Sequence, residues 1–376
     1  MFLRPCPLMM LPDKSLFPFR VVDRFFEELR LARLSPDEDL ISYIERLTQE
    51  GWLAIRDRKV IYLDSYVWIG IRNAALNPGG CRDIESKTLA LLREKVAAGL
   101  IICPCSYHLF CELISQTKER RLNTARLMDE LSLGYSFVSP KDMRAVEIRH
   151  HFLSQINAPN RSSIRSQSLT RIAWVWGTLV PFAPIPDQNL ALQKAFYSSF
   201  GDRSLYELFA AVDFPRDTSD FDEIAESIQD FIRLCSEERL GFEEARNSAA
   251  AGMFDAMNDD VASVSREVFL KHEDYCMRYL QTHRSVKISA SDIPSVAISS
   301  AIYADFAKAS KNMNVKRNDY FDVEHATLAL SYCDFATFDV PMARRLSVPP
   351  VRNYLPKTSV ILGGLDELLK VLQGLR

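Results

Sequence analysis

The chain has 376 residues, of which 46 are basic and 49 acidic, so its formal net charge is −3. With 47% apolar and 25% charged residues, the composition is that of a soluble globular protein and excludes a disordered or fibrous chain. A single core rarely grows to this length, so more than one structural unit is expected. No apolar run approaches the roughly 20 residues that span a bilayer, and prolines break the apolar start. We therefore expect a cytoplasmic protein without a membrane partner, whose eight Cys residues are reduced thiols.

The net charge is an average over unlike segments. Residues 213–244 hold eleven acidic and three basic residues, a local charge of 3 − 11 = −8. Residues 148–186 contain four Arg and no acid, and residues 308–317 contain four basic residues and no acid. The small net charge therefore does not exclude a nucleic-acid partner.

The first 58 residues are predicted to form a helical extension. Ser35 can cap a helix whose first position suits Pro36, and the acids that follow complement the positive helix start. Apolar residues then recur at helical spacing over residues 40–47, and Gly51 can end the helix.

Strands that alternate with helices predict an α/β domain in two parts, residues 59–147 and 315–376. Short apolar runs predict strands at residues 60–63, 100–103, 135–138, 335–338 and 359–362. Helices are predicted at residues 87–97, 113–131, 323–332 and 365–372. This alternation indicates a parallel five-stranded sheet flanked by helices.

Residues 148–314 lack that alternation and are predicted to be a large all-helical insertion. Amphipathic spacing indicates helices at residues 221–235, capped by Ser219, at residues 261–268, and at residues 296–306 after Pro294. Residues 157–168, rich in Ser, Asn and Arg, are expected to form a mobile loop.

Four carboxylates stand where a parallel sheet would bring them together. Asp64 and Asp339 each follow a predicted strand directly. Glu112 lies near the start of the helix after the second strand, and Asp322 is expected to open the helix before the strand that ends at Asp339. Because ligands bind at the carboxyl ends of parallel strands, the four acids are expected to share one mouth. Converging carboxylates repel one another unless a cation compensates their charge, and hard oxygen ligands suit Mg²⁺ or Mn²⁺.

The sequence around these acids resembles the motifs of PIN-domain nucleases. The run N-D-Y-F-D-V-E-H-A-T-L-A-L-S-Y-C-D-F-A-T-F-D at residues 318–339 is similar to the C-terminal signature of that family, in which an Asp opens a helix and a strand ends in T-x-D. Y-L-D-S at residues 62–65 resembles the first motif, and S-x-x-x-x-x-E at residues 106–112 resembles the second. The resemblance covers residues 59–140 and 315–376, and the long insertion departs from compact members.

The resemblance implies a PIN-like fold and an endoribonuclease that hydrolyses RNA phosphodiester bonds with water activated by Mg²⁺ or Mn²⁺. It implies products with a 3′-hydroxyl and a 5′-phosphate. The catalytic, metal-binding residues would be Asp64, Glu112, Asp322 and Asp339. Neighbouring residues that could orient them are Asp319, His325, Ser65 and Thr337. Asp319 is a rival to Asp322 and a candidate helix cap; Asp322 is preferred because counting back from the small residues Ala326 and Ala329 places it at the acid of the motif.

Basic side chains near these motifs are candidates for RNA contacts. They are Lys118, Arg121, Arg161, Arg165, Lys316 and Arg317. Trp174 and Trp176 lie close in sequence to Arg161 and Arg165, and an Arg beside aromatic rings can grip single-stranded RNA. Trp174 itself is expected in the core or in a partner interface.

Other interpretations stay open. The spacing C-x-C-x-x-H-x-x-C, formed by Cys103, Cys105, His108 and Cys111, has enough soft ligands for zinc, although buried structural thiols are the preferred interpretation. His108 is either a structural histidine or a neighbour of the acidic site. The chain could also be a catalytically inactive PIN-like scaffold whose insertion binds a protein partner or inhibitor, or a phosphohydrolase for a small phosphate ester.

Overall fold

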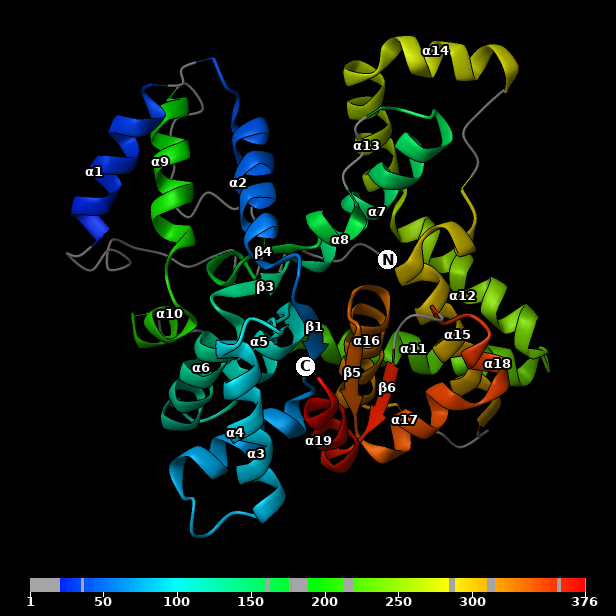
Figure 1. Cartoon of the computed structure of the whole chain (residues 1–376). Helices are drawn as coiled ribbons and strands as arrows, with labels where there is room; N and C mark the ends of the chain where they lie inside the picture. Colours follow the sequence, from blue (N-terminus) through cyan, green and yellow to red (C-terminus); the bar gives the residue numbers. More distant parts are fainter. Residues whose placement is uncertain are drawn as a thin grey trace.

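A parallel sheet of four strands lies at the centre of the molecule, in the order β2–β1–β5–β6 (Figure 1). The computed structural model describes residues 21–34, 37–159, 163–175, 177, 189–211, 219–283, 288–309, 315–356 and 360–375. The strands are β1 (Lys59–Tyr62), β2 (Ile101–Ile102), β5 (Phe335–Phe338) and β6 (Val360–Gly363). Val60, Ile61 and Tyr62 of β1 are at most 1% exposed, as expected for a central strand covered on both faces.

Helices flank this sheet, as the alternating pattern predicts. They are α3 (Ser65–Leu76), α4 (Asp83–Ala97), α5 (Tyr107–Ser115), α6 (Lys118–Ser132), α16 (Arg317–Tyr332), α17 (Val340–Ser347), α18 (Pro349–Arg352) and α19 (Leu365–Gly374). The single helix predicted at residues 113–131 is wrong. Helix α5 ends at Ser115, and α6 begins at Lys118 after the extended residues Gln116 and Thr117.

The third predicted strand belongs to a different ladder. It is β3 (Tyr135–Phe137), which pairs antiparallel with β4 (Leu169–Arg171). An isolated parallel bridge between Cys105 and Ser136 connects it to the segment that follows β2. Because β4 lies within residues 148–314, the prediction of an all-helical insertion is wrong. The loop predicted at residues 157–168 also contains a short helix, α8 (Ile164–Gln167), which Ser163 caps.

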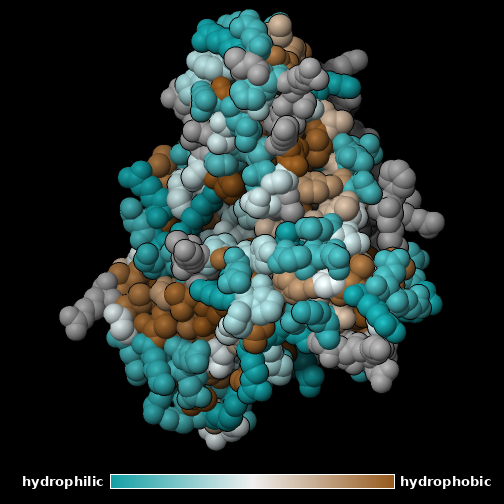
Figure 2. Space-filling model, turned by 90° about the vertical axis from the view of Figure 1, so that its right-hand side faces the viewer, coloured by the Kyte–Doolittle hydropathy of each residue, from teal (hydrophilic) through white to brown (hydrophobic). Residues whose placement is uncertain are grey.

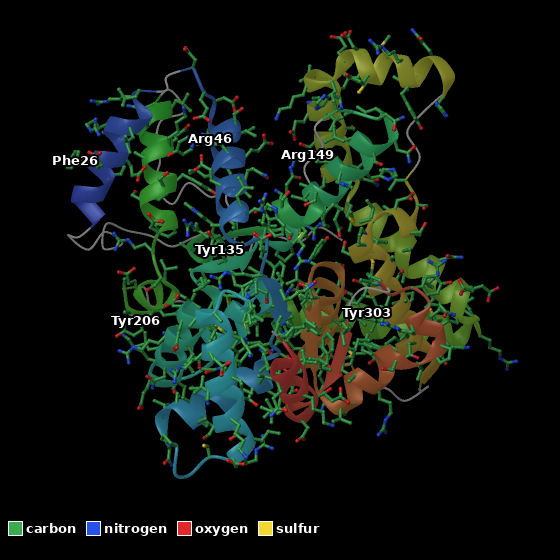
Figure 3. All side chains as sticks on the ribbon, in the orientation of Figure 1. Phe26, Arg46, Tyr135, Arg149, Tyr206 and Tyr303 are labelled. Atoms are coloured by element: carbon green, nitrogen blue, oxygen red, sulfur yellow. The ribbon has the colours of Figure 1, made fainter. Side chains whose placement is uncertain are left out.

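The rest of the insertion is helical and begins inside a helix. Helix α7 (Pro140–Gln155) crosses the predicted boundary at residue 148. The other helices are η3 (Ile172–Trp174), α9 (Leu190–Gly201), α10 (Leu205–Ala211), α11 (Ser219–Glu237), α12 (Phe242–Ala256), α13 (Asn258–Lys271), α14 (Glu273–Thr282), η4 (Ala290–Asp292) and α15 (Pro294–Ala309). Figure 1 shows α13 and α14 at the upper right and α9 beside α1 at the upper left. In Figure 3, Arg149 lies on α7, where it pairs with Glu267 of α13 at 2.8 Å.

The N-terminal extension contains α1 (Val21–Ala32) and α2 (Leu40–Ile55). Ser35 and Pro36 lie outside the described residues, and Asp39 caps α2 by accepting a hydrogen bond from the Ser42 N–H at 2.9 Å. Gly51 does not end α2 but lies inside it. A Cβ at Gly51 would lie 3.2 Å from the Tyr135 ring, so glycine allows α2 to approach β3 closely.

The main hydrophobic core joins the insertion to the α/β part of the chain. Phe209 of α10 stacks on Phe110 of α5 with ring centroids 5.0 Å apart, and both rings are fully buried. Beside them, Tyr206 accepts a hydrogen bond from Arg126 of α6 at 2.8 Å (Figure 3). Trp174 is 1% exposed, as its apolar surroundings predict. Packing therefore crosses the predicted limits of the insertion.

The surface on the right-hand side of Figure 1 is mainly hydrophilic, with separate hydrophobic areas (Figure 2). Among the residues that the structure describes, no helix combines the length and apolar character needed to cross a membrane.

Candidate active site

Asp64 and Asp339 follow two adjacent parallel strands. β1 pairs with β5 in the register Ile61↔Phe335 and Tyr62↔Ala336, so the carboxyl ends of both strands share one edge of the sheet. β2 lies on the other side of β1, and the strand order therefore reverses between β1 and β5. This is the position at which open parallel sheets bind ligands.

Both aspartates also cap helices. Oδ1 of Asp64 accepts a hydrogen bond from the Ser65 N–H at 2.7 Å at the start of α3, and Oδ1 of Asp339 accepts one from the Met342 N–H at 2.8 Å at the start of α17. The positive helix starts partly offset the charge of the carboxylates. Ser65, predicted to orient the acids, does so here through its backbone.

Helix α16 begins at Arg317, so the prediction that Asp322 opens the helix is wrong. Asp319, at the third position of the helix, caps its start: its Oδ2 accepts a hydrogen bond from the Lys316 N–H at 2.7 Å. Of the two roles considered for Asp319, the structure shows the helix cap. Asp322 lies in the second turn of α16 and is partly buried.

Two of the four predicted carboxylates, Asp64 and Asp322, have pKa values that burial and neighbouring acids raise. Burial raises the pKa of Asp64 to about 6; the charges of Glu112 and Asp339 act in the same direction, and His325 opposes them. Burial raises the pKa of Asp322 to about 7, and the charges of Asp64, Asp339 and Glu112 raise it further against His325. The four acids therefore lie near enough to one another for their charges to act on Asp64 and Asp322.

A buried chain of hydrogen bonds reaches this group from inside the protein. Oγ of Ser106 lies 3.0 Å from the hydroxyl of Tyr62, which lies 2.5 Å from Nδ1 of His325. Nε2 of His325 lies 3.2 Å from Oε2 of Glu112. Burial disfavours the charged form of His325, but Glu112, Asp64 and Asp322 outweigh that effect and raise its pKa.

Thr337 ties the two central strands together at the same edge. Its hydroxyl accepts a hydrogen bond from the Asp64 N–H at 2.9 Å and donates one to the Tyr62 carbonyl at 3.1 Å. Thr337 is fully buried. It therefore fixes the backbone that carries Asp64.

Sequence reasoning did not identify Tyr62, Ser106 and Tyr66 as members of the site. Tyr62 and Ser106 stand inside the quoted Y-L-D-S and S-x-x-x-x-x-E runs, but their contacts depend on tertiary packing. The Tyr66 hydroxyl donates to the Phe338 carbonyl at 3.3 Å. Burial, with the charges of Asp64 and Asp339, raises the pKa of Tyr66 well above its usual value.

His108 lies beside the group as a neutral residue. Burial lowers the pKa of His108 well below its usual value, and the charge of His325 adds to that effect. Its Nε2 lies 3.7 Å from Oε2 of Glu324, too far for a hydrogen bond. The ring packs edge-on against Tyr320, with centroids 6.0 Å apart. These contacts agree with a structural histidine.

The thiols proposed as zinc ligands, Cys103, Cys105 and Cys111, are buried and reduced. Burial raises the pKa of Cys105 to about 12 and raises the pKa of Cys103 well above its usual range. Within the described residues, these thiols and His108 do not form a group that could hold a metal ion. Buried structural cysteines are the arrangement that the structure shows in this segment.

The predicted RNA-binding residues are dispersed. Lys118 is exposed at the start of α6, and Lys316 and Arg317 stand at the start of α16, the helix that carries Asp322. Arg161 lies outside the described residues. Arg121 is buried, and Arg165 pairs with a carboxylate of the protein.

Arg121 is 1% exposed and lies under Phe209, with its guanidinium 5.1 Å from the ring centre. Arg165 is at the opposite edge of the sheet from the acids. It pairs at 2.5 Å with Asp334, which precedes β5 and accepts a hydrogen bond from the Val60 N–H. Neither side chain can therefore hold RNA at the carboxylates.

The chain matches no protein-family model, no curated protein and no solved structure.

Carboxylate oxygens are the type of donor that hard divalent cations take. Within the described part of the chain, no set of three or more His, Cys, Asp or Glu side chains is arranged to hold a metal ion by itself. Mg²⁺, however, is usually bound by one or two carboxylates together with water and substrate phosphates. Asp64 is buried and Asp322 is partly buried, and burial raises their pKa values to about 6 and about 7. A nearby cation would relieve the repulsion between the carboxylates.

Proposed function

We propose that the chain is a divalent-metal-dependent ribonuclease with a PIN-like catalytic part. The observation that carries the proposal is that Asp64 and Asp339 follow two adjacent parallel strands where the strand order reverses, and that the charges of Asp64, Asp339 and Glu112 act on Asp322. Their order along the chain, in runs that resemble the motifs of PIN-domain nucleases, supports the same function.

In the proposed site, Asp64 and Asp339 would hold the cation, and Glu112 and Asp322 would complete its surroundings. When bound, Mg²⁺ or Mn²⁺ supplies the charge that activates water and stabilises the leaving oxygen of a phosphodiester. Thr337 keeps Asp64 at the strand end through its two backbone hydrogen bonds. Lys316 and Arg317 precede Asp322 by about one to two helical turns, where cationic side chains can contact RNA phosphates.

The test uses Asp64→Asn and Asp339→Asn in the full chain. Asparagine preserves an N-cap hydrogen bond, so each variant should stay folded, with a melting temperature no lower than that of the wild type, while it loses a negative oxygen. Cleavage of a labelled single-stranded RNA with Mn²⁺ should fall by at least about a hundredfold, the scale of losing one well-placed electrostatic group. The control is Asp83→Asn, which removes an exposed acid at the start of α4, and it should retain full activity.

Unchanged cleavage in both site variants would reject the assignment. Because Asp64 and Asp339 also serve as ordinary helix caps, an inactive scaffold is the second candidate. It is favoured if the wild type cleaves no RNA with either metal. Hydrolysis of a small phosphate ester without cleavage of RNA would favour a phosphohydrolase.

A further inference from the structure

The hydrogen-bond chain Ser106–Tyr62–His325–Glu112 connects three elements that carry site carboxylates. Tyr62 ends β1 two residues before Asp64, and His325 lies on α16 three residues after Asp322, on the same face of the helix. Ser106 caps α5, the helix of Glu112, by accepting a hydrogen bond from the Leu109 N–H at 3.2 Å. This series of hydrogen bonds therefore fixes the positions of β1, α5 and α16 relative to one another.

The donor and acceptor in each of these hydrogen bonds can be assigned by starting from Ser106, the buried end of the series. Ser106, Tyr62 and His325 are at most 1% exposed, so their partners are within the protein. Ser106 already accepts from the Leu109 N–H, and its hydroxyl can donate to Tyr62. When His325 is neutral, Tyr62 donates to Nδ1 and the ring proton lies on Nε2; when the imidazole is charged, both ring nitrogens carry a proton. Nε2 therefore donates to Glu112 in either state.

Glu112 is the carboxylate that most needs such a partner. Its side chain is 26% exposed and stands on a helix rather than at a strand end. A glutamate side chain loses conformational entropy when it is held in one arrangement. Within the described residues, the hydrogen bond from His325 is the contact that holds the Glu112 carboxylate.

We propose that His325, held by Tyr62 and Ser106, is a positioning residue that fixes Glu112 in the orientation needed to meet a divalent cation. The proposal deepens the function of the carboxylate site and rests on the proposed ribonuclease for its effect on catalysis. The imidazole acts through Glu112 and does not touch the substrate. Partners of this kind typically change metal affinity or activity by about 10- to 100-fold.

Two substitutions distinguish the contributions of the two ring nitrogens of His325. In His325→Gln the amide nitrogen reaches the position of Nε2 and can donate to Glu112. In His325→Asn the shorter side chain reaches only the position of Nδ1, next to Tyr62. We expect His325→Asn to weaken Mn²⁺ binding by at least about tenfold and to lower kcat with little change in KM for RNA. His325→Gln should restore both quantities to within about threefold of the wild type.

Tyr62→Phe provides a second test in the same background. It keeps the buried ring but removes the hydroxyl that fixes the tautomer of His325, so Mn²⁺ affinity should fall less than in His325→Asn. Melting temperatures show whether each variant is folded. If His325→Asn does not fold, the comparison of Tyr62→Phe and His325→Gln with the wild type decides the proposal.

The Mn²⁺ dissociation constant, measured by calorimetry, does not depend on RNA cleavage. A wild type that binds Mn²⁺ but cleaves no RNA would refute the proposed function, while the affinities of the variants would still test the positioning role. Equal Mn²⁺ affinities in His325→Asn, His325→Gln and the wild type would overturn the positioning role even if RNA is cleaved. Absence of Mn²⁺ binding by the wild type would overturn it as well.

Discussion

Single residues at the carboxylate site combine structural and chemical roles. Asp64 and Asp339 each use one oxygen to cap a helix and belong to a group of acids that repel one another. The sequence predicts the four carboxylates because each stands at a strand end or on a helix next to one. It does not predict the partners of these acids, because the hydrogen bond between Tyr62 and His325 joins residues 263 positions apart.

The raised pKa values predict how stability depends on pH. A carboxyl whose pKa rises on folding binds its proton more tightly in the native state, so its contribution to stability is present at low pH and is lost as pH rises. For Asp322, the loss should extend from about pH 4 to about pH 7 in cation-free protein. Asp322→Asn should therefore be more stable than the wild type at pH 8, by about 1–2 kcal/mol, but not at pH 4.

Urea denaturation at several pH values measures this difference. Asp319→Asn is the matched control, because Asp319 lies on the same helix and acts as a cap. An equal gain in both variants, or no growth of the gain with pH, would contradict the electrostatic account of Asp322.

At the scale of elements, the alternation of strands and helices predicts the central sheet well. The strand predicted at residues 335–338 is β5 itself, and the other three parallel strands differ from their predictions by a few residues. The pairing of β3 could not be predicted, since its partner β4 has three residues and no alternating pattern. The burial of Arg121 could not be predicted from the sequence either, because the residue that covers it, Phe209, comes from a distant part of the chain.

The connection between β1 and β5 predicts a loss of stability in Thr337→Val. Valine has a similar shape but leaves the buried Asp64 N–H without its acceptor, which should cost about 1–3 kcal/mol. Thr337→Ser keeps the hydroxyl and should lose less. Chemical denaturation compares the two, and equal losses would show that the methyl group rather than the hydroxyl matters.

The positions of the basic residues predict which of them contact RNA. Lys316→Gln with Arg317→Gln should weaken binding of single-stranded RNA and reduce its dependence on salt, because fewer phosphates are neutralised. Arg165→Gln should lower stability through its lost pairing with Asp334 and leave RNA affinity unchanged. Fluorescence anisotropy at several salt concentrations measures these affinities. A larger loss in Arg165→Gln would place the RNA at the other edge of the sheet.

At the scale of the whole molecule, the insertion is part of the main core rather than an appendage. Phe209→Ala should destabilise the chain by about 3–5 kcal/mol, since this fully buried ring packs on Phe110 and Arg121. Phe269→Ala removes a ring that is 37% exposed on α13 and should cost less than about 1 kcal/mol. Similar losses in thermal or urea unfolding would indicate that the insertion packs independently.

The net charge of −3 likewise has meaning only within the folded molecule. Acids from distant segments gather at one edge of the sheet, whereas Lys316 and Arg317 lie at the start of the helix that carries Asp322. The order of these acidic and basic residues along the chain can be read from the sequence. The distances between them depend on packing, which the sequence composition does not determine.

Mn²⁺ binding is the decisive measurement, because both the proposed reaction and the role of His325 require one cation-binding group of carboxylates. Calorimetric titration should show binding to the wild type, at least about tenfold weaker binding to Asp64→Asn and Asp322→Asn, and unchanged binding to Asp319→Asn. Absence of binding to the wild type, or an equal loss in Asp319→Asn and Asp322→Asn, would contradict the account.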